Sequence, residues 1–192
     1  FSESEAALCI ADVAGKGMPA ALLMSNVQAA VHAFASETVS PSELCAKVNR
    51  VVSSSIGEDK FITFFYGLVN AAEGKLVYAN AGHDAGLLLR QDGPLIGLEP
   101  DGAVLGPFPN WTYKHQEIEL RAGDRLLLFT DGLTECRSSA GDEFGEDRLV
   151  ELLFENHKLD AETLRDAIVD AVVRFGGGDF QDDATLLVLC AE

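Results

Sequence analysis

The sequence predicts an α+β fold in which helices pack against antiparallel β-sheet. Two helical segments come early, short apolar segments fill the middle, and two further helical segments precede a last apolar segment. Turns of a few residues join the middle apolar segments, and connections that short favour antiparallel pairing. No internal repeat or low-complexity linker interrupts the chain, so we expect residues 1–192 to form a single domain.

The early helical segments have clear start signals. Gly15 and Gly17 permit a sharp turn, and Pro19 suits the first turn of a helix expected over residues 18–35. Its polar residues follow one narrow stripe, so we expect this helix to be largely buried. The stripe consists of Ser25, Gln28, His32 and Ser36, and we interpret His32 as a surface residue rather than a ligand.

A capping box starts the second helix, in which Ser40 precedes Pro41 and is followed three residues later by Glu43. Its apolar face is formed by Leu44, Val48, Val51 and Val52. We expect Gly57 to end it.

The middle of the chain changes to strand patterns. Strands are expected over 61–69, 76–80 and 85–90, because each is a short apolar run bounded by turn residues. Residues 91–110 are rich in Gly and Pro and are expected to form a loop. Residues 111–120 alternate between apolar and polar and predict a half-buried strand.

The last third combines two strands with two helices. A strand over 125–129 is followed by Asp131-Gly132, and residues 136–146 form a polar loop. Helices are expected over 146–156 and after Asp160, an N-cap residue. The final strand covers 184–190.

Composition excludes several classes of protein. The 31 acidic residues outnumber 14 basic ones and give a net charge of −17, which disfavours binding to nucleic acid or to an anionic membrane. No apolar run is long enough to span a membrane. The four cysteines are scattered, fit no metal or redox motif, and are expected to be small core residues. These features predict a cytoplasmic protein.

Carboxylates lie at the ends of predicted strands. Asp12 and Asp131 follow apolar runs, and Asp182 and Asp183 precede one. If these ends meet at one edge of a sheet, the charges repel, since two charges 4 Å apart cost about 4 kcal/mol at an effective dielectric of 20. A pair of Mg²⁺ or Mn²⁺ ions would relieve this repulsion and activate a water. The alternative is an ordinary strand-turn-helix corner in which each Asp is a turn residue.

The segment Asp12-Val13-Ala14-Gly15-Lys16-Gly17-Met18-Pro19-Ala20-Ala21-Leu22 resembles a defining segment of PPM-type (protein phosphatase 2C-like) serine phosphatases of the bacterial stage II sporulation protein E and RsbU group. Further segments resemble the family in the same order along the chain. They are Tyr78 to His83, Leu105-Gly106, Gly123-Asp124, Phe129 to Glu135, Phe144-Gly145, Arg148-Leu149 and Asp182 to Val188.

The resemblance implies an α-β-β-α sandwich, with two antiparallel sheets between helical layers and the metals at one end. It implies a catalytic and metal-binding role for Asp12, which would bridge two Mn²⁺ or Mg²⁺ ions, and a ligand role for the Val13 carbonyl. Asp131 and Asp182 would complete the set as catalytic metal ligands, and Asp183 is the alternative if the register differs by one.

The chain also departs from the family pattern. A further acidic ligand of the family lies upstream of the Asp12 position, in a Gly-Asp-x-Tyr-Asp segment that residues 1–11 do not contain. We therefore expect a chain lacking its N-terminal strand or strands, part of a larger protein, with a weak second metal site. Ala14 stands where eukaryotic relatives have a proposed general acid. Asp84-Ala85 replaces the usual residues after Gly82-His83, and we interpret His83 as a turn residue. Lys16 either attracts substrate phosphate or is a solvated turn residue.

The predicted function is a metal-dependent protein serine/threonine phosphatase domain of bacterial signalling. The resemblance implies a phosphorylated anti-anti-sigma protein of the STAS fold as substrate, an N-terminal sensor or receiver domain in the parent chain, and a possible homodimer. One alternative is a catalytically weak or inactive phosphatase-like domain that binds a sigma-regulator partner. Another is a metal hydrolase acting on a small phosphoester.

Overall fold

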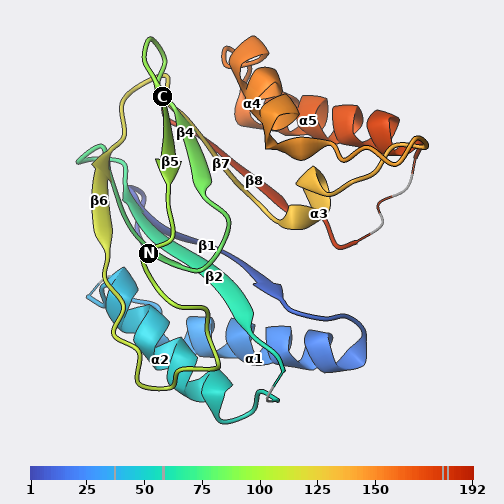
Figure 1. Ribbon diagram of the computed structural model, residues 1–192. Coiled ribbons are helices and arrows are strands. Elements are labelled where there is room, and N and C mark those ends of the chain that lie inside the picture. The colour runs from blue at the N-terminus through green and yellow to red at the C-terminus, as the bar shows by residue number, and fades with distance from the viewer. Residues whose placement is uncertain (37, 58, 179, 181) are drawn as a thin grey trace. The chain divides into compact units, whose positions relative to one another are not determined.

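The computed structural model describes residues 1–36, 38–57, 59–178, 180 and 182–192, which form two compact units. The first unit comprises residues 1–83 and 99–120, and the second comprises residues 84–98 and 121–192. Each unit contains one four-stranded antiparallel sheet (Figure 1). The predicted α+β class with two antiparallel sheets is confirmed.

The sheet of the first unit has the strand order β1-β2-β3-β6. These strands are β1 (Glu5–Val13), β2 (Ile62–Asn70), β3 (Lys75–Ala81) and β6 (Gln116–Glu119). Helices α1 (Met18–Phe34) and α2 (Pro41–Ser53) pack against one face of the sheet, where Val27 and Val48 share a core with Phe64 and Tyr66.

Helix α1 begins where the sequence predicts, but it is less buried than expected. Only Leu23, Val27 and Ala30 are buried, whereas Met18 and Leu22 are 73% and 60% exposed. Only one side of α1 packs, because apolar residues on several sides of a helix cannot all face one sheet and one neighbouring helix. His32 is exposed, as predicted.

Helix α2 confirms the predicted cap, since the Glu43 amide donates to the Ser40 hydroxyl at 3.3 Å. The helix ends at Ser53, before Gly57. Leu44, Val48 and Val52 are fully buried.

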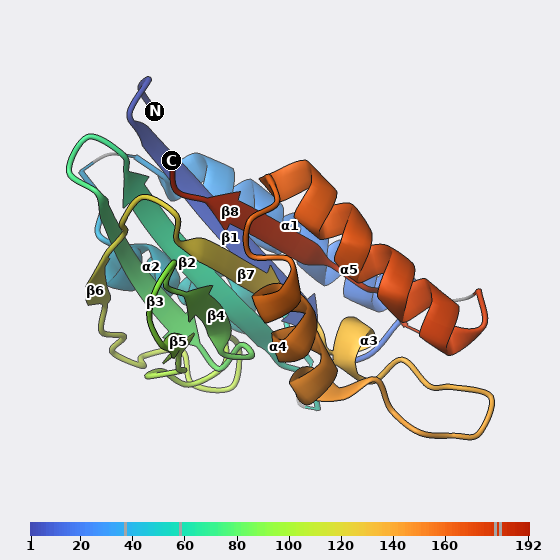
Figure 2. The ribbon, with the colours of Figure 1, turned by 90° about the horizontal axis from the view of Figure 1, so that it is seen from above.

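The sheet of the second unit has the strand order β5-β4-β7-β8. Its strands are β4 (Gly86–Leu89), β5 (Leu95–Leu98), β7 (Arg125–Phe129) and β8 (Leu186–Cys190), and its helices are α3 (Asp131–Thr134), α4 (Gly145–Glu155) and α5 (Ala161–Gly176). Helix α5 runs beside β8 in Figure 2. Leu149 and Ile168 of the helices share a core with Leu127 and Phe129.

Two predictions about the strands are wrong. The segment 91–110 was expected to be a loop, but its residues 95–98 form β5, because Gly93 and Pro94 occupy only the hairpin turn before it. The predicted strand over 111–120 shortens to β6, most of which is exposed.

The expected antiparallel pairing across the turn at residues 82–84 is also wrong, because β3 and β4 belong to different sheets. Gly82 has a φ of 70°, a conformation suited to glycine, and the chain leaves the first unit after the next residue, His83. A short connection here changes sheets instead of forming a hairpin.

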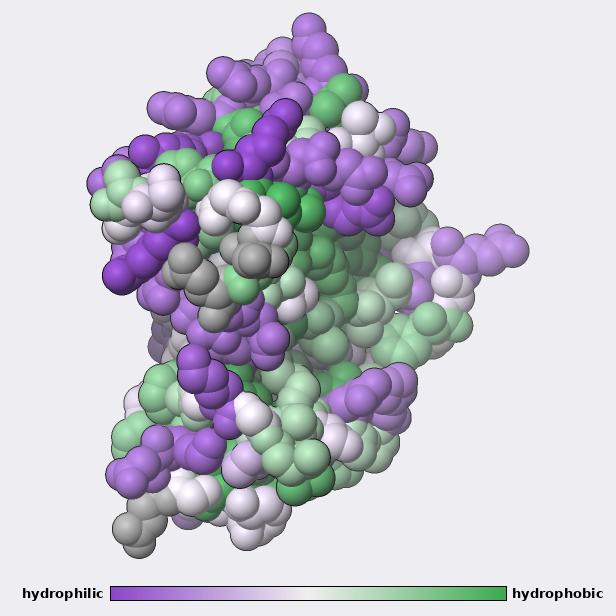
Figure 3. Space-filling view, turned by 90° about the vertical axis from the view of Figure 1, so that its right-hand side faces the viewer, coloured by the Kyte–Doolittle hydropathy of each residue, from purple (hydrophilic) through white to green (hydrophobic). Residues whose placement is uncertain are grey.

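The surface of the protein carries many polar residues, and two of its cysteine side chains are buried. Many hydrophilic residues (purple) lie on the face shown in Figure 3, in keeping with the excess of 31 acidic over 14 basic residues. Cys45 and Cys136 are buried as predicted, but Cys9 is exposed, so its assignment to the core is wrong. Among the described residues, no helix combines the length and hydropathy needed to cross a bilayer.

Candidate functional site

Asp12 lies near the end of β1 in the first unit. Strand β1 pairs with β2 so that Asp12 is opposite Thr63 and Val13 is opposite Ile62. The ladder continues one step beyond both strands, since the Ala14 amide donates to the Phe61 carbonyl at 2.9 Å. The turn to α1 then passes through Gly15 at a φ of 111° and Gly17 at a φ of 80°, which confirms the predicted glycine turn.

His83 of the first unit lies between β3 and β4, outside both strands, and its side chain is buried. Its side chain is 2% exposed, and its Nδ1 lies 2.8 Å from the Thr63 hydroxyl oxygen. The Asn80 side chain fixes the turn by accepting a hydrogen bond from the His83 amide at 2.8 Å. Because Thr63 is opposite Asp12 and cross-strand partners face the same side of a sheet, the partner of His83 lies on the same side of the sheet as the predicted metal ligand.

Asp131 and Asp183 are brought close together in the second unit by Thr130. The Thr130 amide donates to the Thr185 carbonyl at 3.1 Å, and the Thr130 hydroxyl accepts from the Thr185 amide at 2.9 Å. The same hydroxyl donates to the Asp183 carbonyl at 3.2 Å. Thr130 is 2% exposed, so these bonds join the end of β7 to the approach to β8 in a buried setting.

Gly132 makes this approach possible. A Cβ at this position would lie 2.4 Å from the Asp183 carbonyl oxygen, closer than any side chain tolerates. The glycine of the predicted Asp131-Gly132 sequence is therefore required for the close contact between its own backbone and that of Asp183. The carboxylate of Asp182 accepts a hydrogen bond from the Asp183 amide at 2.9 Å, which orients the neighbouring pair.

A carboxylate outside the predicted ligand set also lies near this end of β7. Asp84 precedes β4, which pairs with β7. Burial raises the pKa of Asp84 above the model-compound value of 3.8, and the negative charge of Asp131 raises it further. The only signal in the sequence was the departure from the family pattern after His83.

The predicted ligands thus lie on two units, and the expectation that they share the edge of one sheet is wrong. Asp12 and Val13 belong to the sheet of the first unit, whereas Asp131 and the pair before β8 belong to that of the second. Within the described part of the chain, no three His, Cys, Asp or Glu side chains form a ready-made metal site. The ligand set remains a prediction.

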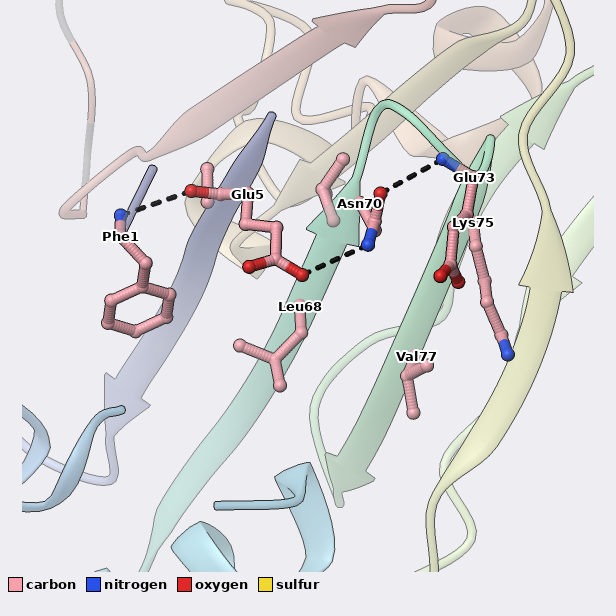
Figure 4. A pocket seen from close by; sticks show the side chains of 9 residues that line it. Phe1, Glu5, Leu68, Asn70, Glu73, Lys75 and Val77 are labelled. Carbon is pink, nitrogen blue, oxygen red and sulfur yellow. Dashed lines mark hydrogen bonds between the residues drawn. The ribbon is translucent and has the colours of Figure 1, made fainter. Parts of the chain in front are cut away.

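Each unit has a cavity far from these residues. In the first unit a cavity of about 160 Å³ is lined by Phe1, Glu5 and Asn70, with Glu5 accepting a hydrogen bond from Asn70 (Figure 4). Glu5 and Asp12 stand at opposite ends of β1, about 23 Å apart along an extended strand. This cavity is therefore separate from the Asp12 turn.

A larger cavity of about 480 Å³ in the second unit lies beside the start of β7, whereas Asp131 follows its end. Its lining includes a buried ion pair between Arg90 and Asp124. The Asp124 carboxylate also accepts a hydrogen bond from the Arg121 amide at 2.8 Å. These contacts hold two turns together and give the pair a structural role.

Comparison with solved structures identifies the fold of this chain. It is the fold of a known class of proteins, the protein phosphatase 2C (PP2C) fold. The chain matches the SiaA-PP2C domain of Pseudomonas aeruginosa with a TM-score of 0.84 at 18% identity, over 100% of this chain and 78% of that chain. It matches the catalytic domain of the serine/threonine phosphatase PstP, solved with 2 manganese ions, with a TM-score of 0.67 at 22% identity, over 95% and 86% of the two chains.

The chain belongs to the Stage II sporulation protein E (SpoIIE) family, whose profile matches residues 2–192. It is 37% identical to the phosphoserine phosphatase RsbU of Bacillus subtilis over 184 residues, which are 95% of this chain and 54% of RsbU. The chain thus spans about half the length of that relative. The family and fold predicted from the sequence are confirmed.

Proposed function

We propose that this chain is the catalytic domain of a metal-dependent protein serine/threonine phosphatase, a phosphoric monoester hydrolase. The observation that carries the proposal is the pair of acidic strand ends in a chain of the SpoIIE family. Asp12 is the residue before the last of β1 in one unit, and the backbones next to Asp131 and Asp183 are in contact at the end of β7 in the other.

The donor set fits Mn²⁺ or Mg²⁺. Carboxylates and a backbone carbonyl are oxygen donors, which these ions prefer. The pKa of Asp84 is raised first by burial and then by the negative charge of Asp131, and a divalent cation would relieve the second of these effects. We assign Asp12 as the bridging ligand, the Val13 carbonyl as a further ligand, and Asp131 with Asp182 as the remaining ligands. Asp183 is the alternative to Asp182.

Other residues of the chain hold the proposed metal ligands in position. When bound, the two ions supply a water activated for attack on phosphorus and stabilise the negative charge that develops on the phosphoryl group. The β1–β2 ladder fixes Asp12 through its pairing with Thr63, and Thr130 fixes the approach of Asp183 to Asp131. With both carboxylate segments anchored to strands, the ligands are preorganised on rigid elements.

The proposed substrate is a phosphoserine or phosphothreonine protein, and the preferred class is a phosphorylated anti-anti-sigma protein of the STAS fold. Support comes from the similarity to the phosphoserine phosphatase RsbU and from a solved relative that contains the RsbU and RsbW domains of Rv1364c, at a TM-score of 0.76. An N-terminal sensor or receiver domain in the parent protein and a cytoplasmic location belong to the same proposal.

The test is Mn²⁺-dependent phosphate release from a phosphoserine protein by the full-length protein and by Asp131→Asn. We expect the variant to lose turnover, because the neutral amide removes a charge from the metal site. Asp170→Asn, at an exposed position on α5, is the matched control and is expected to keep full activity. Full activity in Asp131→Asn would falsify the assignment.

A second candidate function is capture of a sigma-regulator partner without catalysis, and Ala14 at the expected general-acid position favours it. This alternative predicts that the full-length protein binds its phosphoprotein but releases no phosphate with Mn²⁺. A third candidate, hydrolysis of small phosphoesters, predicts faster turnover of a sugar phosphate than of a phosphoserine protein.

A further inference from the structure

We propose that Lys60 binds the phosphoryl group of the substrate beside the Asp12 turn, an inference that rests on the proposed function. A phosphomonoester on serine carries a charge of about −1.5 to −2 at neutral pH. The chain itself has a net charge of −17, so its overall field repels such a group. A cationic side chain close to the reacting end would add to the attraction exerted by the metal ions, and lysine is a common binder of phosphate.

The strand register places Lys60 opposite the turn that follows Asp12. Asp12 pairs with Thr63, Val13 pairs with Ile62, and Ala14 bonds to Phe61. The next pair in this series is Gly15 with Lys60. The backbone amide of Lys60 also donates to the Gly57 carbonyl at 3.1 Å, which anchors Lys60 in the segment that follows α2 in the chain.

The ammonium group of Lys60 lies over the backbone of Gly15. A Cβ built on Gly15 would be 2.9 Å from Lys60 Nζ, so the ammonium occupies the space that any larger residue at position 15 would need. Gly15 also has a φ of 111°, which L-residues rarely adopt. The glycine therefore has two roles, since it allows the turn and it leaves room for the ammonium three residues after Asp12.

Lys60 is half-buried, whereas Lys16 is exposed. Among the described residues, none of the ion pairs includes Lys60. A half-buried lysine can pack its methylene stem, which restricts the side chain, while its charged end reaches solvent. Lys16 lies on the same turn but is exposed, so it can attract an anion from a distance without holding it in one place.

Three lysine variants of the full-length protein separate the charge from packing. Lys60→Met keeps most of the volume over Gly15 and removes the charge, and Lys60→Arg keeps the charge. Lys47→Met is the matched control, because Lys47 is another half-buried lysine of the first unit, on α2. For each variant we would measure KM and kcat with a phosphoserine protein and Mn²⁺, and Mn²⁺ affinity and inorganic phosphate binding by calorimetry.

We expect Lys60→Met to weaken phosphate binding and raise KM roughly 10- to 100-fold, which is the effect of losing a hydrogen bond to a charged group. Mn²⁺ affinity and the melting temperature should stay unchanged, Lys60→Arg should restore most of the binding, and Lys47→Met should behave like the parent. Equal phosphate binding by the parent and Lys60→Met, including none in either, overturns the inference.

The same data keep the two proposals apart. A parent protein without Mn²⁺-dependent turnover contradicts the proposed function, whereas the phosphate titration still decides the role of Lys60. An active parent whose KM and phosphate affinity survive Lys60→Met contradicts only the role of Lys60.

Discussion

The two acidic strand ends of this protein are built in different ways. After β1, the chain turns through glycines of positive φ, and the atom nearest to a Cβ built on Gly15 is Nζ of the Lys60 side chain. After β7, the buried hydroxyl of Thr130 donates a hydrogen bond to the Asp183 carbonyl. The atom nearest to a Cβ built on Gly132 is that same carbonyl oxygen. A larger residue at position 15 can be accommodated by moving a side chain. A larger residue at position 132 can be accommodated only by moving the backbone.

This difference teaches where the proposed site is rigid. Metal ligands must be held to a fraction of an ångström, so fixed backbone around Asp131 suits a ligand position. An ammonium on a side chain beside Asp12 suits recognition of a substrate that must enter and leave, because it can adjust without movement of the backbone. In the proposed site both strand ends supply metal ligands, and the Asp12 end also offers a cation to the substrate.

The largest effect is expected from Gly132→Ala. Its Cβ would meet the Asp183 carbonyl oxygen at 2.4 Å, so the backbone of β7 or β8 must shift. We expect the free energy of unfolding to fall by about 3 kcal/mol, the upper range for overpacking, with loss of Mn²⁺-dependent turnover. Urea denaturation and phosphate release would measure this. Gly57→Ala, at a glycine with open space around it, is the control and should match the parent.

A smaller effect is expected from Gly15→Ala. The new methyl group displaces Lys60 Nζ, which can move, and the remaining cost is the backbone conformation at a φ of 111°. We expect the free energy of unfolding to fall by about 1–2 kcal/mol. Phosphate binding should weaken together with it, because the ammonium loses its place. A loss of stability greater than that of Gly132→Ala in urea denaturation would reverse the comparison between the two strand ends.

The smallest effect is expected from Asp84→Asn in the metal-free protein. Because the pKa of Asp84 is raised in the folded state, ionisation costs the folded protein stability as the pH rises through that pKa. The variant should therefore be more stable than the parent at pH 7. Below the ordinary Asp pKa of 3.8 the advantage disappears, since the carboxyl group is then protonated in both states.

Melting temperatures of the parent and Asp84→Asn across this pH range, with chelator present, would test the prediction. Asp170→Asn controls for the loss of a surface charge. A constant difference between parent and Asp84→Asn at all pH values would show that Asp84 ionises normally in the folded protein.

Features governed by neighbours in the chain could be predicted from the sequence alone. The Ser40 cap, the Asp160 cap on Thr163 and the glycine turn before α1 are all as expected. So are the apolar strands around 62–70 and 125–129. These features depend on hydrogen bonds and steric limits within a few residues, and the side-chain types in the sequence specify them directly.

The identity of the strand partners was decided only by the tertiary structure. The sequence predicted pairing across residues 82–84, but the chain changes sheets there. It also missed β5, because Leu95–Leu98 becomes a strand only by pairing with β4. Whether a short apolar segment pairs with its neighbour in sequence depends on which faces are buried, and that depends on the whole fold.

The same division applies to the proposed site. The sequence by itself determined the acidic residues at the strand ends and the family to which the chain belongs. Only the tertiary structure placed Lys60 over Gly15, His83 against Thr63 and the Asp183 carbonyl against Gly132. The physical reason is that these contacts join residues distant in the chain, whose approach is fixed by strand register and backbone conformation rather than by local propensity.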